Sequence, residues 1–343
     1  MERHALIIGA GIGGLAVAAA LSRDGWAVTV HERDHALPTT GTALGMWPAA
    51  LKALDDIGLG TEVRAAGLPQ ERGEFRRPDG SRITTVSSDG VHLVSRPALL
   101  TVLHRAAGAD VRFGSPVDDP STTGADLVVV ADGVFSRSRE RLFGSRFRAR
   151  YSGSTAWRGT IDGMPAGAFV ETWGRGVKFG VTPQEDGRTN WFASAALPEG
   201  RFQPGREAAA LRAMFRGWAD PVRPVLDALD EQSILRHDIH VTPPLPSYVR
   251  GEVALIGDAA HAMTPDLGRG ACEAIIDAVT LAACLRQTRS TSQALIAYDH
   301  RRRPATQRLA RVAGLAARMS HVRHALPVRD GVLRLAMLAG PPQ

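Results

Sequence analysis

The chain has 343 residues, of which 44% are hydrophobic and 22% charged. This length predicts two domains, or one large α/β unit with an inserted layer, and this composition excludes a disordered, collagen-like or disulfide-stapled protein. The 41 Lys and Arg against 35 Asp and Glu give a net charge of +6. Residues 286–334 hold 11 Arg and two Asp, a balance of +9, so the rest of the chain carries −3. Nucleic-acid binding is not expected, because the basicity belongs to one segment that lacks interleaved aromatic residues.

Cysteine use and hydropathy indicate a reducing, cytoplasmic setting. Cys272 and Cys284 are the only cysteines, and on one helix they would lie about 18 Å apart, too far for a disulfide. The apolar stretch at residues 5–21 could serve as a signal-peptide core, but it fits a nucleotide-binding pattern better. No uninterrupted run of 18 or more apolar residues predicts a membrane span.

The N-terminal residues predict one βαβ unit, with strands at residues 5–8 and 27–30 and a helix at residues 15–23. Glu32 lies at the end of the second strand, where a carboxylate accepts hydrogen bonds from a ribose 2′-hydroxyl. Uncapped N–H groups at the start of the helix favour phosphates. The turn before this helix matches G-x-G-x-x-G at Gly9, Gly11 and Gly14. The pattern predicts an adenine dinucleotide site and leaves NAD and FAD open.

The pattern further along the chain alternates between α/β and antiparallel character. Residues 126–131 and 252–256 read as buried strands, and a long helix is predicted from Gly270 to about Arg286. Residues 151–240 hold four of the six Trp and half of the ten Phe. Their alternation predicts antiparallel strands around one amphipathic helix at residues 206–216.

Two further stretches complete the predicted elements. Residues 73–86 form a smaller strand-like patch that is broken by the turn signal Pro78-Asp79-Gly80. From residue 290 onward the pattern is helical, and Pro304 and Pro327 are expected to interrupt it.

The segment after the strand at residues 252–256 predicts a second ligand-binding element. Asp258 ends this strand and can accept hydrogen bonds from a polyol chain. The backbone of residues 268–270, at the start of the next helix, can approach a flat ring that carries developing negative charge. A simple NAD dehydrogenase does not need this second element.

These motifs resemble a known family, the FAD-dependent monooxygenases of the aromatic-hydroxylase (p-hydroxybenzoate hydroxylase-like, class A flavoprotein) type. The segment at residues 257–278 is similar to the family's GDAAH-x₃-P-x-x-G-x-G signature. Residues 94–100 resemble its FAD-contacting Arg segment, and residues 126–139 resemble its D-G motif. Residues 155–159 resemble the substrate-domain sheet of salicylate- and urate-hydroxylase-like members. Three positions depart from the family pattern: Ala49 for Asn, Val130 for Gly and Ile276 for Glu.

Pattern and resemblance together predict an α/β fold with a Rossmann-like FAD-binding domain and an inserted, mostly antiparallel β-sheet substrate domain. We assign residues 1–72, 94–150 and 241–289 to the FAD-binding domain. Residues 73–93 and 151–240 are assigned to the substrate domain, and residues 290–343 to a C-terminal helical segment. The arginines of that last segment are expected either to lie on solvated helix faces or to attract nucleotide phosphates.

The resemblance also implies the residues that hold FAD. The ADP half is expected on Gly9, Gly11, Gly13, Gly14, Glu32 and Arg33. Arg96 and Asp258 are expected to contact the pyrophosphate and ribityl chain, and Asp132 and Arg139 of the D-G motif are expected to serve FAD and the nicotinamide donor. The isoalloxazine edge is expected to meet Asp266, Leu267, Gly268, Arg269 and Gly270.

The resemblance implies that NADH or NADPH reduces FAD and leaves, and that O₂ then forms a flavin C4a-hydroperoxide. The expected reaction is hydroxylation or epoxidation of a small aromatic, heteroaromatic or polyketide-like substrate by a monomer or homodimer. No metal site is expected. Two alternatives stay open: a flavin-dependent reductase or dehydrogenase without oxygen insertion, and a non-catalytic FAD-binding protein.

The candidate residues on the substrate side each have a structural alternative. Asp266 is a candidate base or only a loop carboxylate. Arg158 is a candidate for binding an anionic substrate or only caps a sheet edge. Trp173, Phe179 and Trp191 are candidates for lining an aromatic substrate pocket, or they pack in the core of the sheet.

Overall fold

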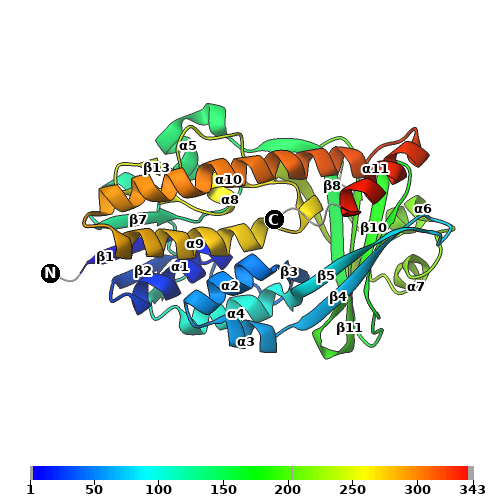
Figure 1. Ribbon diagram of the computed structural model, residues 1–343, viewed down its shortest axis with the longest axis horizontal. Coiled ribbons are helices and arrows are strands. Elements are labelled where there is room, and N and C mark those ends of the chain that lie inside the picture. Colours follow the sequence, from blue (N-terminus) through cyan, green and yellow to red (C-terminus); the bar gives the residue numbers. More distant parts are fainter. Residues whose placement is uncertain (1–2, 202–203, 339–343) are drawn as a thin grey trace.

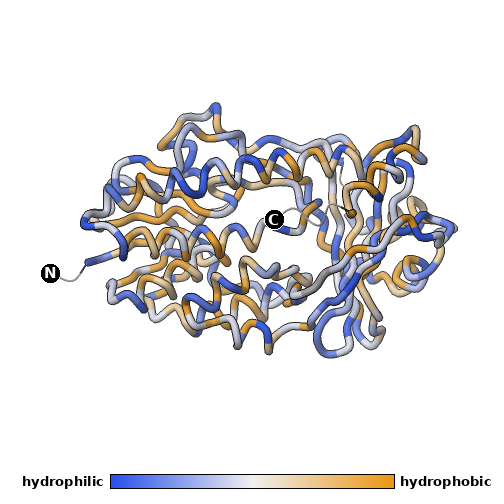
Figure 2. The backbone as a smooth tube through the Cα atoms, viewed as in Figure 1, coloured by the Kyte–Doolittle hydropathy of each residue, from blue (hydrophilic) through white to orange (hydrophobic). Residues whose placement is uncertain are grey.

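The computed structural model describes residues 3–201 and 204–338. Figure 1 shows an elongated molecule with one β-sheet toward each end and the long helix α10 (Thr291–Ser320) running along both. Figure 2 shows apolar residues concentrated along the central strands and helices, with hydrophilic residues toward the outside. This distribution places the core of each half between a sheet and its covering helices.

The smaller sheet has six strands in the order β13-β14-β7-β1-β2-β6. Every neighbouring pair except β13–β14 is parallel. Strand β7 is buried at all four residues, as a parallel sheet covered on both faces requires. The strands are β1 (His4–Ile8), β2 (Ala27–His31), β6 (Asp110–Arg112), β7 (Leu127–Val130), β13 (Val249–Arg250) and β14 (Val253–Leu255).

The larger sheet has eight strands in the order β12-β8-β11-β10-β9-β4-β5-β3. Only the β4–β9 pair is parallel, so the sheet is mostly antiparallel. One difference from the sequence-based division is that β3 joins this sheet rather than the FAD-binding part. The strands are β3 (Ala43–Met46), β4 (Leu68–Arg76), β5 (Arg82–Ser95), β8 (Arg150–Ile161), β9 (Phe169–Trp173), β10 (Val177–Gln184), β11 (Arg188–Ala195) and β12 (Leu235–Val241).

Helices cover both sheets, and none in the described part of the chain is long and apolar enough to cross a membrane. The stretch at residues 206–216, predicted as one helix, is followed by a second short one, α7. The helices besides α10 are α1 (Ile12–Arg23), α2 (Pro48–Asp56), α3 (Gly60–Ala65), α4 (Arg96–Ala106), α5 (Arg137–Phe143), α6 (Glu207–Met214), α7 (Val222–Asp227), α8 (Asp258–His261), α9 (Gly270–Gln287) and α11 (Leu326–Leu338).

Helix α10 corrects the expectation that Pro304 interrupts the C-terminal helical pattern. The helix continues from Thr291 to Ser320 with Pro304 inside it. Proline removes the N–H that would bond to the carbonyl of His300. Both residues are exposed, so water can hydrogen-bond to this carbonyl while buried neighbours such as Arg302 and Thr306 hold the helix in place. Pro327 lies in the first turn of α11, where proline is tolerated.

A buried ion network ties α10 to the rest of the smaller half. Asp277 of α9 has no exposed surface and accepts hydrogen bonds from Gly257 N (2.8 Å), His261 Nε2 (2.6 Å) and Arg302 Nε (2.6 Å). Burial alone would raise the pKa of Asp277, but His261 and Arg302 lower it. Arg302 also pairs with Glu273, one helical turn before Asp277. The network therefore fixes the end of β14, α8, α9 and α10 relative to one another.

Replacing Asp277 by Asn is expected to lower the free energy of unfolding by about 3–5 kcal/mol, because it leaves Arg302 buried without one of its two carboxylates. Urea unfolding followed by circular dichroism measures this difference. Asp56→Asn is the control, since it breaks the exposed Lys52–Asp56 pair and should change stability by less than about 0.5 kcal/mol. Equal losses in both variants would contradict the assignment.

Candidate active site

Four adjacent parallel strands carry the predicted nucleotide-binding residues at their carboxyl ends. Gly9 follows β1, Glu32 follows β2, Asp132 comes two residues after β7, and Asp258 comes three residues after β14. Because these strands are neighbours in the order β14-β7-β1-β2, the four positions lie along one edge of the sheet. Ligands of open α/β sheets bind at this edge.

The glycine turn has the shape that a pyrophosphate needs. Gly9 has φ +105°, and a Cβ on Gly14 would lie 1.8 Å from the carbonyl oxygen of Gly9. By contrast, a Cβ on Gly11 would meet nothing within 4 Å, so open space borders the turn. Gly11 precedes α1 without a side-chain cap, which leaves the first N–H groups of α1 available to an anion.

Glu32 reaches back to the glycine turn. Its Oε2 accepts a hydrogen bond from Ala10 N at 2.7 Å, and its Oε1 accepts one from Asp34 N at 2.9 Å. This fixes the carboxylate beside the turn, where a ribose would lie. Arg33 is exposed and pairs loosely with Asp34, with 3.7 Å between Nε and Oδ1. Gly13 serves packing, since a Cβ there would lie 3.4 Å from Ala274 of α9.

The two residues predicted from the D-G motif differ in their surroundings. Asp132 Oδ1 is buried and has no hydrogen-bond partner among the described residues. Burial raises the pKa of Asp132, against hydrogen bonds from Ser136 and Ser138. Such an orphaned oxygen fits a ligand hydroxyl that completes its hydrogen bonding.

Arg139, which the motif resemblance assigned to FAD and the nicotinamide donor, makes its hydrogen bonds within the protein. It is fully buried and donates to the backbone oxygens of Val134 (2.7 Å), Phe147 (2.9 Å) and Ala259 (3.0 Å). A further bond goes to Thr242 Oγ1 at 3.4 Å. The guanidinium therefore holds the D-G loop against α8, and this replaces its predicted contact with the nicotinamide donor.

The charge of Arg96 acts on Asp258 near the start of α9. A Cβ added to Gly270 would lie 4.0 Å from Asp258 Oδ1, which puts the carboxylate beside the first turn of α9. The Asp258 side chain is accessible, yet the protein around it raises the pKa of the carboxyl by desolvation, against the charges of His261, Arg96 and Arg139. Arg96 is exposed at the start of α4, so its side chain is free to reach an anionic ligand.

The predicted flavin loop at residues 266–270 precedes α9. Gly268 adopts φ +62°, a left-handed conformation that favours glycine, and Leu267 lies half-buried before it. Arg269 is buried and pairs with Glu273 at 3.0 Å, so its side chain supports the loop. Trp47, which the sequence did not single out, lies against this loop: the Arg269 guanidinium stands 5.5 Å from the Trp47 ring centroid.

The larger sheet turns one face toward the flavin loop and the other toward α6 and α7. Phe179 and Trp191 lie on the second face, where their rings stack at 5.6 Å and Phe215 of the helical layer packs against Phe179 at 5.1 Å. Both are fully buried there. This corrects their prediction as pocket residues and favours the alternative, core packing.

The opposite face carries Lys178, which the sequence analysis did not select. Along β10 it alternates with Phe179, and its ammonium lies 2.9 Å from Asp266 Oδ1 and 3.0 Å from Glu171 Oε1. Burial opposes the charge, but Asp266 and Glu171 raise the pKa of Lys178 above its usual value. Likewise, burial alone would raise the pKa of Asp266, whereas Lys178 lowers it.

Trp173 lies on the same face as Lys178 but under α11. Its Nε1 donates to Glu171 Oε1 at 2.7 Å, and the Arg329 guanidinium stands 5.6 Å from its ring centroid. Leu333 of α11 packs against it. Trp173 therefore orients Glu171 and is covered by α11.

Arg158 of β8 points to the same face, since it pairs in register with Phe192 while Trp157 packs toward the helices. Among the described residues it has no hydrogen-bond or ion-pair partner. Burial lowers the pKa of Arg158, and the nearby charge of Arg96 lowers it further. Burial and the charges of Arg158, Arg96 and Arg236 likewise lower the pKa of His237. An uncompensated cation in this position fits an anionic ligand.

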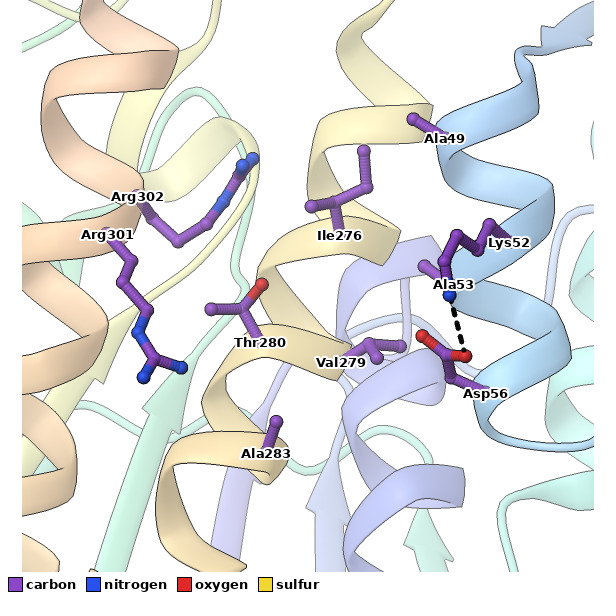
Figure 3. A pocket seen from close by; sticks show the side chains of 10 residues that line it. All are labelled: Ala49, Lys52, Ala53, Asp56, Ile276, Val279, Thr280, Ala283, Arg301 and Arg302. Atoms are coloured by element: carbon purple, nitrogen blue, oxygen red, sulfur yellow. Dashed lines mark hydrogen bonds and ion pairs between the residues drawn. The ribbon is translucent and has the colours of Figure 1, made fainter. Parts of the chain in front are cut away.

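A separate groove of about 390 Å³ lies between α2, α9 and α10 (Figure 3). Ala49 and Ile276, two of the departures from the family pattern, line it together with Lys52, which bonds to Asp56 at 3.2 Å. None of the glycine-turn or flavin-loop residues lines this groove.

The residues present fit FAD. Open space at Gly11, an uncapped helix above it and the orphaned Asp132 oxygen are what a dinucleotide would fill. The second element, at Asp258 and the start of α9, lies at the same sheet edge, and α9 also begins without a side-chain cap. A ligand with a pyrophosphate, a polyol and a flat ring matches these parts.

Comparison with known proteins agrees with this geometry. A family model described as an FAD binding domain matches residues 2–118 and 87–313. The chain is 36% identical to an aurachin C monooxygenase/isomerase of Stigmatella aurantiaca over 86% of its own length and 83% of the relative. It is 34% identical to an FAD-dependent urate hydroxylase of Klebsiella pneumoniae, with 87% and 85% covered.

Solved structures confirm the predicted fold class. HpxO of Klebsiella pneumoniae, complexed with FAD and uric acid, superimposes with a TM-score of 0.88 at 29% identity and covers 99% of this chain and 97% of its own. A salicylate hydroxylase, at 21% identity and a TM-score of 0.81, shares the fold over 98% of this chain and 95% of its own. The resemblance found in the sequence is therefore confirmed.

Family membership also decides between the alternatives that the sequence left open, in favour of oxygen insertion. The chain belongs to the FAD-dependent monooxygenases: it is a flavoprotein oxidoreductase that uses FAD, NAD(P)H and O₂ to add one oxygen atom to a small organic substrate.

Proposed function

We propose that this monooxygenase oxygenates an acidic nitrogen heterocycle, bound as its anion against Arg158. The observation that carries this proposal is the buried Lys178–Asp266 pair, which joins the larger sheet to the flavin loop. Asp266 is the proposed acceptor of the proton from the substrate's N–H or O–H. Several relatives are named for nitrogen heterocycles, among them urate and a 2-heptyl-3-hydroxy-4(1H)-quinolone.

The charge state of Asp266 supports an acidic substrate. Because Lys178 lowers the pKa of Asp266 below its usual value, the carboxylate stays ionised at neutral pH. A carboxylate of this kind takes a proton only from a group of comparable acidity. A substrate with an acidic ring N–H or O–H satisfies this condition, and a neutral hydrocarbon does not.

In the proposed mechanism the chain's residues bind and polarise the substrate. Asp266, kept ionised by Lys178, takes the proton of the substrate's acidic N–H or O–H, and Arg158 pairs with the anion that forms. Loss of the proton raises the electron density of the ring, which favours attack on an electrophilic oxygen. Bound FAD, reduced by NAD(P)H, supplies that oxygen from O₂. The dense packing around Lys178 keeps water from the pair.

For the cofactor we propose Gly9, Gly11, Gly13, Gly14 and Glu32 at the ADP half, with Arg33 nearby. Asp132, Arg96 and Asp258 are proposed for the pyrophosphate and ribityl chain. The isoalloxazine is proposed against Leu267, Gly268, Gly270 and Trp47, supported by Arg269.

We also propose a reducing, cytoplasmic location, supported by two buried free thiols, Cys272 and Cys284. A monomer or homodimer is the proposed assembly. One solved relative at 26% identity is described as a tetramer, so assembly varies among similar chains.

The function is tested by supplying ¹⁸O₂ and NAD(P)H to the FAD-loaded enzyme with two groups of compounds. The acidic heterocycle is uric acid, and the neutral carbocycles are naphthalene and styrene. Mass spectrometry should find one ¹⁸O in a product of the first group only. Labelled products from the neutral carbocycles alone would overturn the proposed substrate class and leave the monooxygenase assignment intact.

Asp258→Ala is expected to weaken FAD binding by at least about tenfold, because the carboxylate beside Gly270 is lost. Flavin absorbance of the purified protein and titration of the apoprotein with FAD measure this change. Asp56→Ala is the matched control on the surface of α2 and should bind FAD normally. A fully yellow Asp258→Ala protein would contradict the cofactor assignment.

Lys178→Gln is expected to shift the acidic limb of kcat/KM upward in pH. Burial raises the pKa of Asp266, and without Lys178 its main opposing charge is gone, so this pKa rises. Activity is then lost as the pH falls through the higher value. Initial rates between about pH 5 and 9 measure the shift. Lys52→Gln, which replaces the chain's only other lysine, should leave the profile unchanged. An unshifted profile in Lys178→Gln would remove Asp266 from the mechanism.

A further inference from the structure

Large apolar side chains on the surface gather at the C-terminal end of the described chain. Eight such side chains are exposed among the described residues, and six of them lie on the second half of α10 or on α11. A soluble protein tolerates scattered exposed apolar residues, but a cluster marks an interaction surface. The proposed function does not use these six residues.

On α11 the exposed apolar residues form a stripe. Val328, Val332 and Leu335 are 67%, 48% and 68% exposed, and their spacing of four and three residues puts them on one side of the helix. The opposite side is buried: Arg329 donates to Gly174 O at 2.6 Å, and Leu333 packs beside Trp173. The stripe therefore points away from the protein body.

The outer side of α10 combines apolar and cationic residues. Val312 and Leu315 are 38% and 60% exposed. Arg308, Arg311 and Arg318 are exposed at the same helical face, opposite the buried residues of this segment. Helix α11 follows α10 after a connection at residues 321–325, which adds the exposed Arg323.

The exposed arginines of α10 differ from Arg302 and Arg329 in lacking a carboxylate partner. Arg302 and Arg329 are buried and paired with acidic residues. For Arg308, Arg311 and Arg318, by contrast, no carboxylate of the described residues lies within ion-pair distance. Their charge is therefore uncompensated by the protein and available to an external anion.

We propose that this C-terminal face, made of Val312, Leu315, Val328, Val332, Leu335 and the exposed arginines of residues 308–323, docks on an anionic lipid bilayer. Apolar side chains would enter the headgroup–acyl boundary, and the guanidinium groups would pair with lipid phosphates.

Charge favours a bilayer over a second copy of this chain or a nucleic acid. A second copy of this chain would bring two sets of unpaired arginines together, and their repulsion opposes association. A nucleic acid would satisfy the arginines but would leave the apolar stripe in water. An anionic bilayer offers phosphates to the arginines and an apolar interior to the stripe.

The test is co-sedimentation of the FAD-loaded enzyme with two kinds of vesicle, phosphatidylcholine alone and phosphatidylcholine with about one third phosphatidylglycerol. Binding is expected only to the anionic vesicles and should weaken in about 0.5 M NaCl. Replacing Arg308, Arg311 and Arg318 by Gln should weaken binding on the order of 100-fold, at roughly fivefold per arginine near the surface. Val328→Ser, Val332→Ser and Leu335→Ser combined should also release the protein.

Matched controls keep the test specific. Ile296→Ser alters an apolar residue of α10 that is 55% exposed but outside the face. Arg105→Gln, Arg150→Gln and Arg216→Gln combined remove three exposed arginines elsewhere. Both controls should bind like the unaltered enzyme, and flavin absorbance verifies that every variant is folded.

Three results would overturn the proposal. One is an enzyme that stays in the supernatant with anionic vesicles at low salt. Another is a dimer in sedimentation velocity that the Val328/Val332/Leu335 variant abolishes, which would assign the face to a second copy. The last is binding to duplex DNA that depends on Arg308, Arg311 and Arg318 but not on the apolar stripe.

Discussion

The buried carboxylate of Asp277 is the constraint on which the rest of the structure depends. It accepts hydrogen bonds from the turn that ends β14, from α8 and from α10, and so connects three elements that meet at the cofactor edge. Arg302 extends this connection to Glu273, and Glu273 to Arg269 at the start of α9. Two carboxylates thus face two guanidinium groups and one imidazole, and burial makes each charge costly unless all partners stay in place. This ion network therefore sets the positions of Asp258 and the flavin loop.

Local spacing explains which parts of the site could be predicted from the sequence. The glycine turn, Glu32 and Asp258 each lie within three residues of the end of a strand. The order of strand, turn and helix therefore predicts that they lie at the same edge of the sheet, without knowledge of distant contacts. Lys178 could not be found in this way, because its partner Asp266 is 88 residues away in the chain and only the packing of the larger sheet on the flavin loop brings them together. For the same reason the alternation along β10 could not show whether Phe179 or Lys178 faces the site; α6 and α7 decide this by covering one face.

Two of the three departures from the family pattern, Ala49 and Ile276, lie on neighbouring helices. Ala49 lies on α2 and Ile276 on α9, and both line the groove between these helices and α10 (Figure 3). The family pattern has Asn at the first position and Glu at the second, so this chain lacks two polar side chains on one surface. The sequence alone shows two unrelated substitutions, and only the packing of α2 on α9 relates them.

The arginines and the buried lysine separate into those that the protein neutralises and those that it does not. Arg302 and Lys178 each face two carboxylates, and Arg139 is surrounded by backbone oxygens, so the protein itself neutralises these cations. Arg158 has none of these partners, although burial makes an unpaired charge expensive. A folded chain retains such a cation when a ligand anion completes it, as we propose both for Arg158 and for the exposed arginines of the C-terminal face. The +9 segment is therefore not uniform: Arg302 and Arg329 hold helices in place, whereas Arg308, Arg311 and Arg318 leave their charge to an external partner.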